Sequence, residues 1–227
     1  MSASALPSAL VLGATGLVGG YCLQHIMASG LYEKLHILTR RELLLPQNGT
    51  THIVQHIGSL DDMDKMHEAF RVRDVFCALG TTIRIAGSQE AFRTVDYEYV
   101  VQASICAARQ GAQQMLVVSA LGADPQSSVF YSRVKGEMER DIQKAGLLAT
   151  HCFRPSFIEG NRTESRLGEK LGIGLTKFLS PLLIGMLRKY RVIHAETIAR
   201  AMLRTAQRGD TGHHIIESDV IERLGIM

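Results

Sequence analysis

Apolar residues recur along this chain in two rhythms, short continuous runs and longer stretches with helical spacing. Runs of strand length occupy residues 9–12, 34–39, 52–57, 74–78, 114–119 and 149–153, and a last one is expected over 213–217. Helices are expected directly after the first run and over 89–110, 130–144 and 195–207. Strand and helix signals that alternate in this way predict an α/β fold, a doubly wound parallel sheet with helices on both faces.

A glycine-rich turn follows the first apolar run. Gly13, Gly16 and Gly19 are spaced G-x-x-G-x-x-G, and the apolar stripe of the helix that begins there ends at Gly30. Bare backbone at a helix N-terminus offers N–H groups to an anion, although glycines also mark ordinary turns. The pattern therefore predicts a Rossmann-like fold and a bound dinucleotide. The backbone expected to contact it comprises Gly13, Ala14, Thr15, Gly16, Leu17, Val18 and Gly19.

The end of the second predicted strand indicates which dinucleotide is bound. An acidic residue at this position usually holds the ribose 2′-hydroxyl of NAD, but here Arg40 and Arg41 follow the strand. A guanidinium can bond two oxygens of a 2′-phosphate at once. The sequence thus favours NADP(H), unless the two arginines are simply solvated loop residues.

Two further loops are expected at the same edge of the sheet. After the third strand, Leu60 and Asp61 would lie beside the adenine, although Asp61 could instead cap the helix that follows. After the fourth strand, backbone and hydroxyl groups could bond the cofactor, or the segment could be an ordinary strand-to-loop turn. The residues concerned there are Leu79, Gly80, Thr81 and Thr82.

A tyrosine and a lysine share one helix face after the fifth strand. Tyr131 and Lys135 are four residues apart, and Ser119 ends the strand twelve residues before the tyrosine. A lysine charge stabilises tyrosinate, which makes the phenol a usable proton donor, and a serine hydroxyl can hold a carbonyl oxygen. The alternative is an exposed helix pair without a catalytic role.

These motifs, in this order, carry a resemblance. The glycine turn, Ser119 and Tyr131-x-x-x-Lys135 together resemble the short-chain dehydrogenase/reductase superfamily, in its extended or atypical branch. Further motifs are similar to the Tat-interacting-protein (oxidoreductase-like) subgroup over nearly the whole chain: Leu79-Gly80-Thr81-Thr82, Val95-Asp96-Tyr97, Val118-Ser119-Ala120-Leu121-Gly122-Ala123-Asp124, Phe130-Tyr131, Val134-Lys135-Gly136-Glu137 and Phe153-Arg154-Pro155.

The resemblance implies a role for each matching residue. Tyr131 would be the general acid or base, Lys135 would bond the nicotinamide ribose and tune the tyrosine, and Ser119 would orient the substrate oxygen. The backbone after Pro155, near Ser156 and Phe157, would meet the nicotinamide carboxamide. One departure stands out, because many members place a relay asparagine on the helix after the fourth strand and none occurs around residues 95–97.

Composition narrows the class of protein. The sequence is 46% hydrophobic and 21% charged, as in an ordinary globular protein. Its length of 227 residues suits one domain, so with the motifs above we expect a single NAD(P)-binding Rossmann domain over 1–227. A net charge of +3 gives no argument for nucleic acid, and no secretory signal or membrane-spanning apolar run is visible. The four cysteines lack C-x-x-C spacing, and the nine histidines lack ligand spacing. We therefore expect buried reduced thiols, no metal site and a cytoplasmic location.

Residues 156–192 break the strand–helix rhythm with a basic and apolar stretch. The resemblance implies a segment that covers the substrate, but its composition also suits a protein partner, a membrane surface, or a helix packed on the core. A homodimer paired through residues 100–108 and 134–142 is another arrangement that the sequence allows, if those helices are not simply core.

The first functional hypothesis is an NADP(H)-dependent oxidoreductase that transfers hydride between nicotinamide and a carbonyl or alcohol substrate. The second is a non-catalytic NADP(H)-binding protein that regulates or senses through protein partners, and the missing asparagine motivates it. A third, a sugar-nucleotide epimerase, would normally prefer NAD, and Arg40 and Arg41 speak against it.

Overall fold

The computed structural model describes residues 7–46, 50–159 and 191–226. Its main sheet is parallel throughout and has the strand order β3-β2-β1-β4-β5-β6-β9. The strands are β1 (Ser8–Leu12), β2 (Lys34–Thr39), β3 (His52–Ile57), β4 (Asp74–Cys77), β5 (Gln114–Val118), β6 (Ala149–Arg154) and β9 (Gly212–Glu217). The direction of winding reverses between β1 and β4, and ligands of doubly wound sheets bind beyond the carboxyl ends of the strands at such a point. The predicted fold class is confirmed.

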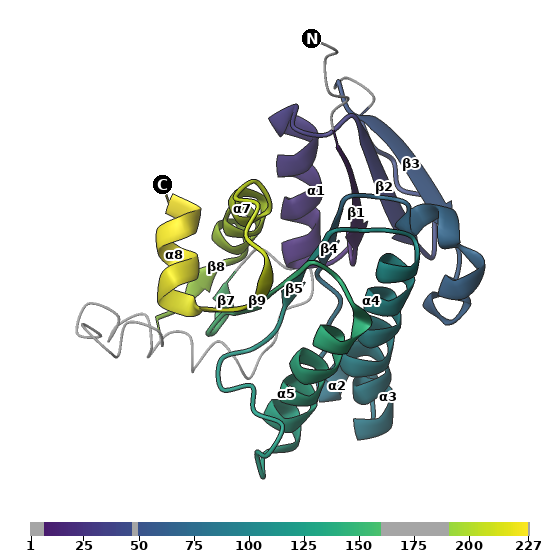
Figure 1. The fold of residues 1–227 in the computed structure, drawn as a ribbon. Helices are drawn as coiled ribbons and strands as arrows, with labels where there is room; N and C mark the ends of the chain where they lie inside the picture. The colour runs from purple at the N-terminus through teal and green to yellow at the C-terminus, as the bar shows by residue number, and fades with distance from the viewer. Residues whose placement is uncertain (1–6, 47–49, 160–190, 227) are drawn as a thin grey trace.

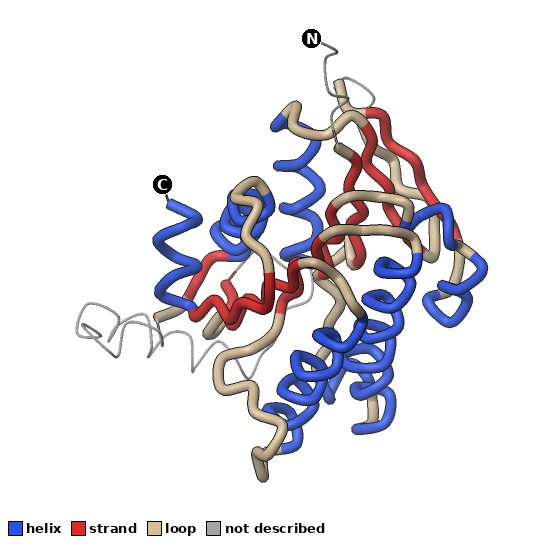
Figure 2. The backbone as a smooth tube through the Cα atoms, in the orientation of Figure 1, coloured by secondary structure: helices blue, strands red, loops and turns tan. Residues whose placement is uncertain are grey.

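Helices cover both faces of this sheet (Figures 1 and 2). One face carries α1 (Leu17–Ser29), α7 (Ala195–Ala206) and α8 (Ser218–Ile226). The other carries α4 (Tyr99–Arg109), α5 (Phe130–Ile142) and the 3₁₀ helices Leu60–Lys65 and His67–Phe70. Short α2 (Ile83–Ala86) and α3 (Gln89–Arg93) precede α4, and a 3₁₀ turn (Gln143–Ala145) follows α5.

Alternation along the strands divides the core into two layers. Ala9 and Val11 of β1 pack beneath α1 and α7, whereas Leu10 and Leu12 pack on the face of α4 and α5. Successive strand side chains point to opposite faces, so a strand covered on both faces reads as a continuous apolar run. This double burial explains why the predictions of the inner strands agree with the structure to within about a residue.

The helix expected over 89–110 is helical throughout but not uniform. Between α3 and α4 the chain makes a π-helical turn, Thr94–Glu98, and the run ends before Gly111, whose φ is +83°. π turns are rare and frequently occur at functional sites. The predicted helix over 130–144 is likewise α5 with a 3₁₀ end.

The sequence did not predict α2, α8 or the strands β7 (Ile158–Glu159) and β8 (Ile193–His194). The two strands pair parallel to each other. Residues 160–190, which include the apolar stretch 178–187 and the basic stretch 188–190, lie outside the described residues. None of the helices in the described ranges is long and apolar enough to cross a membrane. All four cysteines are buried and free, as expected.

The apolar faces of the helices considered for a homodimer are occupied within the chain. Val100, Ala103 and Ala107 of α4 pack in the core with Met138 and Ile142 of α5. The homodimer itself stays a prediction.

Candidate active site

The turn between β1 and α1 is built from backbone that side chains could not occupy. Gly13 has a φ of +80°, and a Cβ there would lie 2.6 Å from the carbonyl oxygen of Ala78 in the neighbouring strand's loop. A Cβ on Gly19 would lie 2.1 Å from the carbonyl oxygen of Gly13. Both glycines are therefore required for the first turn of α1 to pack against β1 and β4.

The N-terminus of α1 is open to an anion. Gly16 is its N-cap and provides no side chain to bond the first N–H groups, and the first turn contains no acidic residue. Unpaired N–H groups and the positive end of the helix dipole favour a phosphate there.

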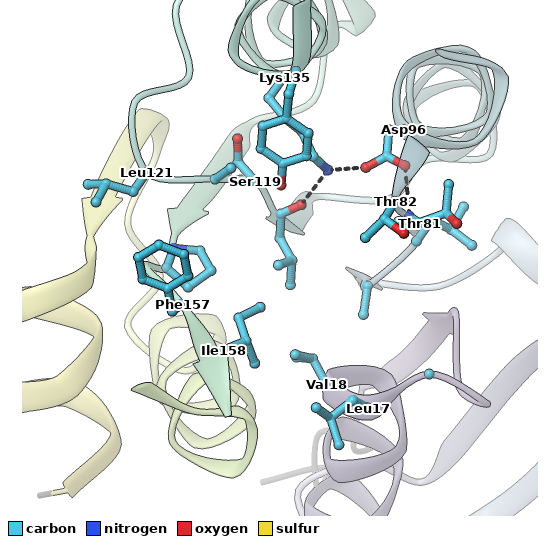
Figure 3. A pocket seen from close by; sticks show the side chains of 18 of the residues that line it. Leu17, Val18, Thr81, Thr82, Asp96, Ser119, Leu121, Lys135, Phe157 and Ile158 are labelled. Atoms are coloured by element: carbon cyan, nitrogen blue, oxygen red, sulfur yellow. Dashed lines mark hydrogen bonds and ion pairs between the residues drawn. The ribbon is translucent and has the colours of Figure 1, made fainter. Parts of the chain in front are cut away.

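A cavity of about 440 Å³ opens beside this turn, at the carboxyl ends of β1, β4, β5 and β6 (Figure 3). The site residues predicted from the sequence that line it are Gly16, Leu17, Val18, Leu79, Gly80, Thr81, Thr82, Ser119, Tyr131, Lys135, Pro155 and Ser156. Phe157, expected beside Ser156, also lines it, and the lining residues that were not predicted are Ala78, Asp96, Val118, Ala120, Leu121 and Ile158. The structure thus brings together the glycine turn, the serine, and the tyrosine–lysine pair.

Ser119, Tyr131 and Lys135 reach this cavity from β5 and α5. The Ser119 side chain is buried, and its Oγ has no hydrogen-bond partner among the described residues. Tyr131 lies in the first turn of α5, 37% exposed, with its ring 5.5 Å from that of Phe92. A buried hydroxyl without a partner is costly, and a ligand oxygen would satisfy it.

The Lys135 ammonium is buried and bound on two sides. Its Nζ lies 2.7 Å from Oδ1 of Asp96 and donates to the carbonyl oxygen of Val118 at 3.4 Å (Figure 3). Burial acts to lower the pKa of Lys135, but the Asp96 carboxylate and Tyr131 outweigh it and raise that pKa above the ordinary value. Lys135 is therefore a fixed positive charge beside Tyr131.

Asp96 is the functional candidate that sequence reasoning missed. It lies in the π turn, is 1% exposed, and its Oδ2 accepts the backbone N–H of Thr81 at 2.8 Å. Its sequence signal is an aspartate within the helix after the fourth strand, the region in which the resemblance implies a relay asparagine.

Two of the loop residues have structural partners of their own. Thr82 is the N-cap of α2, and its Oγ accepts the N–H of Ile85 at 3.3 Å. The N–H of Ser156 donates to Ser218 Oγ at 3.2 Å, and the Ser156 hydroxyl donates to the carbonyl of Arg191. Both residues still line the cavity.

The remaining predicted cofactor contacts do not line the cavity. Arg40 and Arg41 are exposed after β2, where the Thr39 hydroxyl donates to the Arg41 carbonyl at 2.7 Å. Asp61 accepts hydrogen bonds from the hydroxyls of Tyr99 and Ser59, which lower its pKa. Ser59, rather than Asp61, is the N-cap of the 3₁₀ helix, next to Leu60. Ala14 and Thr15 line a separate groove along α1, and Gly13 and Gly19 form the packed interior of the turn.

No protein-family model matches the chain. The protein HTATIP2 of Rattus norvegicus is 33% identical over 220 residues, which cover 96% of this chain and 89% of that protein. The mitochondrial protein FMP52-1 of Scheffersomyces stipitis is 34% identical over 181 residues and covers 76% of each chain. FMP52 of Saccharomyces cerevisiae, also named as mitochondrial, is 31% identical over 157 residues, 69% of this chain and 68% of that protein.

Solved structures share the fold at low sequence identity. MoeE5 in complex with UDP-glucose and NAD has a TM-score of 0.69 at 15% identity and covers 92% of this chain and 75% of its own. The Bordetella bronchiseptica enzyme WbmG in complex with NAD has a TM-score of 0.66 at 12% identity, with 95% and 74% covered. At this identity the likeness shows the fold alone.

The relatives correct one expectation and confirm another. Several of them are named as mitochondrial, which contradicts the expected cytoplasmic location. That expectation rested on reduced cysteines and a missing secretory signal, and neither feature separates the cytosol from other reducing compartments. The resemblance inferred from the motifs is confirmed by the full-length relative. The chain belongs to the Tat-interacting-protein subgroup of the atypical short-chain dehydrogenase/reductases.

Proposed function

We propose that this protein is an NADP(H)-dependent oxidoreductase acting on a carbonyl or alcohol substrate. The observation that supports it is the convergence of Ser119, Tyr131 and Lys135 on one cavity beside a glycine turn. The turn fits a diphosphate, because a Cβ on Gly13 or Gly19 would close it and no side chain caps the N-terminus of α1, whose first turn has no acidic residue.

Each residue of the set has a distinct task in this proposal. The dinucleotide, when bound, supplies or accepts the hydride. The Tyr131 hydroxyl gives a proton to the substrate oxygen in reduction and takes it back in oxidation. The Ser119 hydroxyl donates a hydrogen bond to that oxygen, and the Lys135 charge favours the tyrosinate form between turnovers.

The open part of the cavity favours a substrate with an apolar body. Leu121, Phe157 and Ile158 lie around it in Figure 3, and Phe157 is 58% exposed. The two charged lining residues, Lys135 and Asp96, are paired with each other. Aldehydes and ketones with aliphatic or aromatic groups are therefore the first substrates to test.

The decisive experiment compares Tyr131→Phe with Tyr97→Phe on such a panel. Tyr97 bonds Asp141 at 3.0 Å and does not line the cavity, so it controls for the loss of a tyrosine hydroxyl. We expect Tyr131→Phe to lower kcat at least 100-fold with NADPH affinity within about twofold, since general acid catalysis contributes 10²–10⁴-fold. Turnover by Tyr131→Phe at the wild-type rate would refute the assignment.

The preference for NADP(H) has its own test. Arg40 and Arg41 follow β2 and are exposed, as a pair that binds a 2′-phosphate would be. We expect the double change to Ser to weaken NADPH binding about tenfold or more and to leave NADH binding unchanged. Tighter binding of NADH than of NADPH by the unaltered protein would assign NAD instead.

A second candidate function is an NADP(H)-binding regulatory or sensing protein without turnover. The observation that favours it is Asp96, which binds Lys135 from the helix on which many members have a relay asparagine. This function predicts tight NADPH binding, no turnover across a broad carbonyl panel, and a protein partner whose affinity changes with NADPH. If the affinity for the protein partner is the same with and without NADPH, the sensing function is excluded.

We further propose a mitochondrial location, supported by the names of the FMP52 relatives. Fractionation of cells that express the full chain tests it, and recovery outside mitochondria would reject it.

A further inference from the structure

An aspartate and a lysine meet on the wall of the cavity with almost no contact with water. The Lys135 and Asp96 side chains are 4% and 1% exposed, and Nζ lies 2.7 Å from Oδ1 (Figure 3). The second carboxylate oxygen accepts the Thr81 N–H at 2.8 Å. Asp96 therefore links the loop after β4 to α5 through one carboxylate.

On its loop side this pair lies close to the backbone of Gly80. A Cβ on Gly80 would lie 3.3 Å from Oδ1 of Asp96 and 3.8 Å from Nζ of Lys135. The π turn sets the direction of Asp96, because the extra residue in that turn shifts side chains relative to a regular helix. The loop, the turn and α5 thus meet at one ion pair.

We propose that Asp96 is a positioning residue, whose carboxylate holds the Lys135 ammonium charged and in place at the cavity wall. The effect of Asp96 on NADPH binding rests on the proposed function, in which Lys135 contacts the cofactor. Asp96 differs in this from an asparagine, which could bond the ammonium but not balance its charge.

The energetic reason is the cost of a buried charge. Burial opposes the charged form of Lys135, and the carboxylate offsets that cost. Removal of the carboxylate charge leaves burial unopposed by Asp96, so Lys135 should lose its proton at lower pH. A purely structural role for Asp96 would lower stability without moving this titration.

The other titratable groups facing Lys135 are Tyr131 on α5, Cys77 at the end of β4 and Cys152 on β6. Burial raises the pKa of Cys77 to about 11 and that of Cys152 well above its ordinary value. Both thiols therefore stay neutral between pH 7 and about 9.5, which leaves Asp96 and Tyr131 as the groups that matter.

The first test needs no cofactor. The Cε signal of Lys135 is followed by NMR in protein labelled with ¹³C-lysine, assigned by its loss in Lys135→Arg, and titrated in the unaltered protein, Asp96→Asn and Asp141→Asn. Asp141 is a matched control on α5, bonded by Tyr97, Arg140 and Lys144, that does not line the cavity. We expect the pKa of Lys135 to fall by about two units or more in Asp96→Asn alone, because a buried ammonium then lacks its balancing charge.

Two results would overturn the proposal. One is an unchanged Lys135 titration in Asp96→Asn. The other is a Lys135 signal that titrates well below the usual lysine range, about 10.4, in the unaltered protein, and this measurement decides the matter if Asp96→Asn does not fold.

The second test measures NADPH affinity from pH 7 to 9.5. We expect NADPH binding by Asp96→Asn to weaken at least fivefold more over this range than binding by Asp141→Asn. The addition of Lys135→Met to both variants should abolish this difference. Equal pH dependence in the two aspartate variants would show that the charge of Lys135 does not serve binding. If the unaltered protein binds no dinucleotide, the proposed function fails, while the NMR titration still decides the role of Asp96.

Discussion

At the scale of single residues, two adjacent glycines of α1 should respond oppositely to the same change. A Cβ on Gly19 would lie 2.1 Å from the backbone oxygen of Gly13, whereas one on Gly20 would lie 3.5 Å from that of Ala14, an ordinary contact. We expect Gly19→Ala to destabilise the protein by at least about 2 kcal/mol, because backbone must move. Gly20→Ala should stabilise it by about 0.5–1 kcal/mol, the usual gain in a helix.

Urea unfolding of both variants measures these effects, and an NADPH titration shows whether the turn survives. Equal stability of the two variants would mean that Gly19 does not hold the first turn of α1 against β1.

The spacing of residues along the sequence was enough to identify the site residues that a single helix or strand end positions. Tyr131 and Lys135 share a helix face, and Ser119 directly follows β5, so their meeting followed from the α/β topology. Asp96 could not be found in this way. Its contact with Lys135 depends on a π turn and on the space at Gly80, and no helical periodicity encodes either.

At the scale of elements, one arginine joins β6, α5 and β9. Arg154 bonds the buried Glu139 of α5 through Nε at 3.0 Å and Nη2 at 2.6 Å, and reaches Glu217 of β9 at 3.3 Å. We expect Arg154→Met to cost about 3–5 kcal/mol, because Glu139 would be left buried without its partner.

The matched control is Arg200→Met. Arg200 pairs with Glu196 at 2.6 Å on the surface of α7, where such a pair is worth about 1 kcal/mol or less. Denaturant unfolding compares the two variants, and Arg154→Met/Glu139→Met should recover much of the loss. A cost for Arg154→Met as small as that of the control would show that the pair does not join the elements.

The element order was predictable because each inner strand is buried on both faces, but the end of the chain was not. α8 begins directly after β9, and Ile221 is one of its few buried apolar residues. β7 and β8 are two residues each, too short to show any alternation.

At the scale of the whole molecule, one buried histidine pairs with a partly exposed one between the two outermost strands at each end of the sheet. His36 Nδ1 lies 2.8 Å from His56 Nε2 between β2 and β3, and His151 stacks on His214 between β6 and β9 with ring centroids 4.9 Å apart. Both ring nitrogens of His151 are buried without a partner among the described residues. Burial, followed by the neighbouring histidine, lowers the pKa of His36 and of His151 to about 4.

Acid should therefore loosen both ends of the sheet at once. A histidine with a folded pKa near 4 and an unfolded pKa near 6.5 contributes its full stability above pH 6.5 and loses it as the pH falls toward 4. Each such histidine should lower the free energy of unfolding by about 2 kcal/mol between pH 7.5 and pH 5. Urea unfolding at both pH values should show His151→Phe losing about 2 kcal/mol less than the unaltered protein, while His52→Gln, an exposed control on β3, should behave as the unaltered protein does. If His151→Phe loses as much free energy of unfolding between pH 7.5 and pH 5 as the unaltered protein does, the acid sensitivity does not arise at the strand pair that His151 joins.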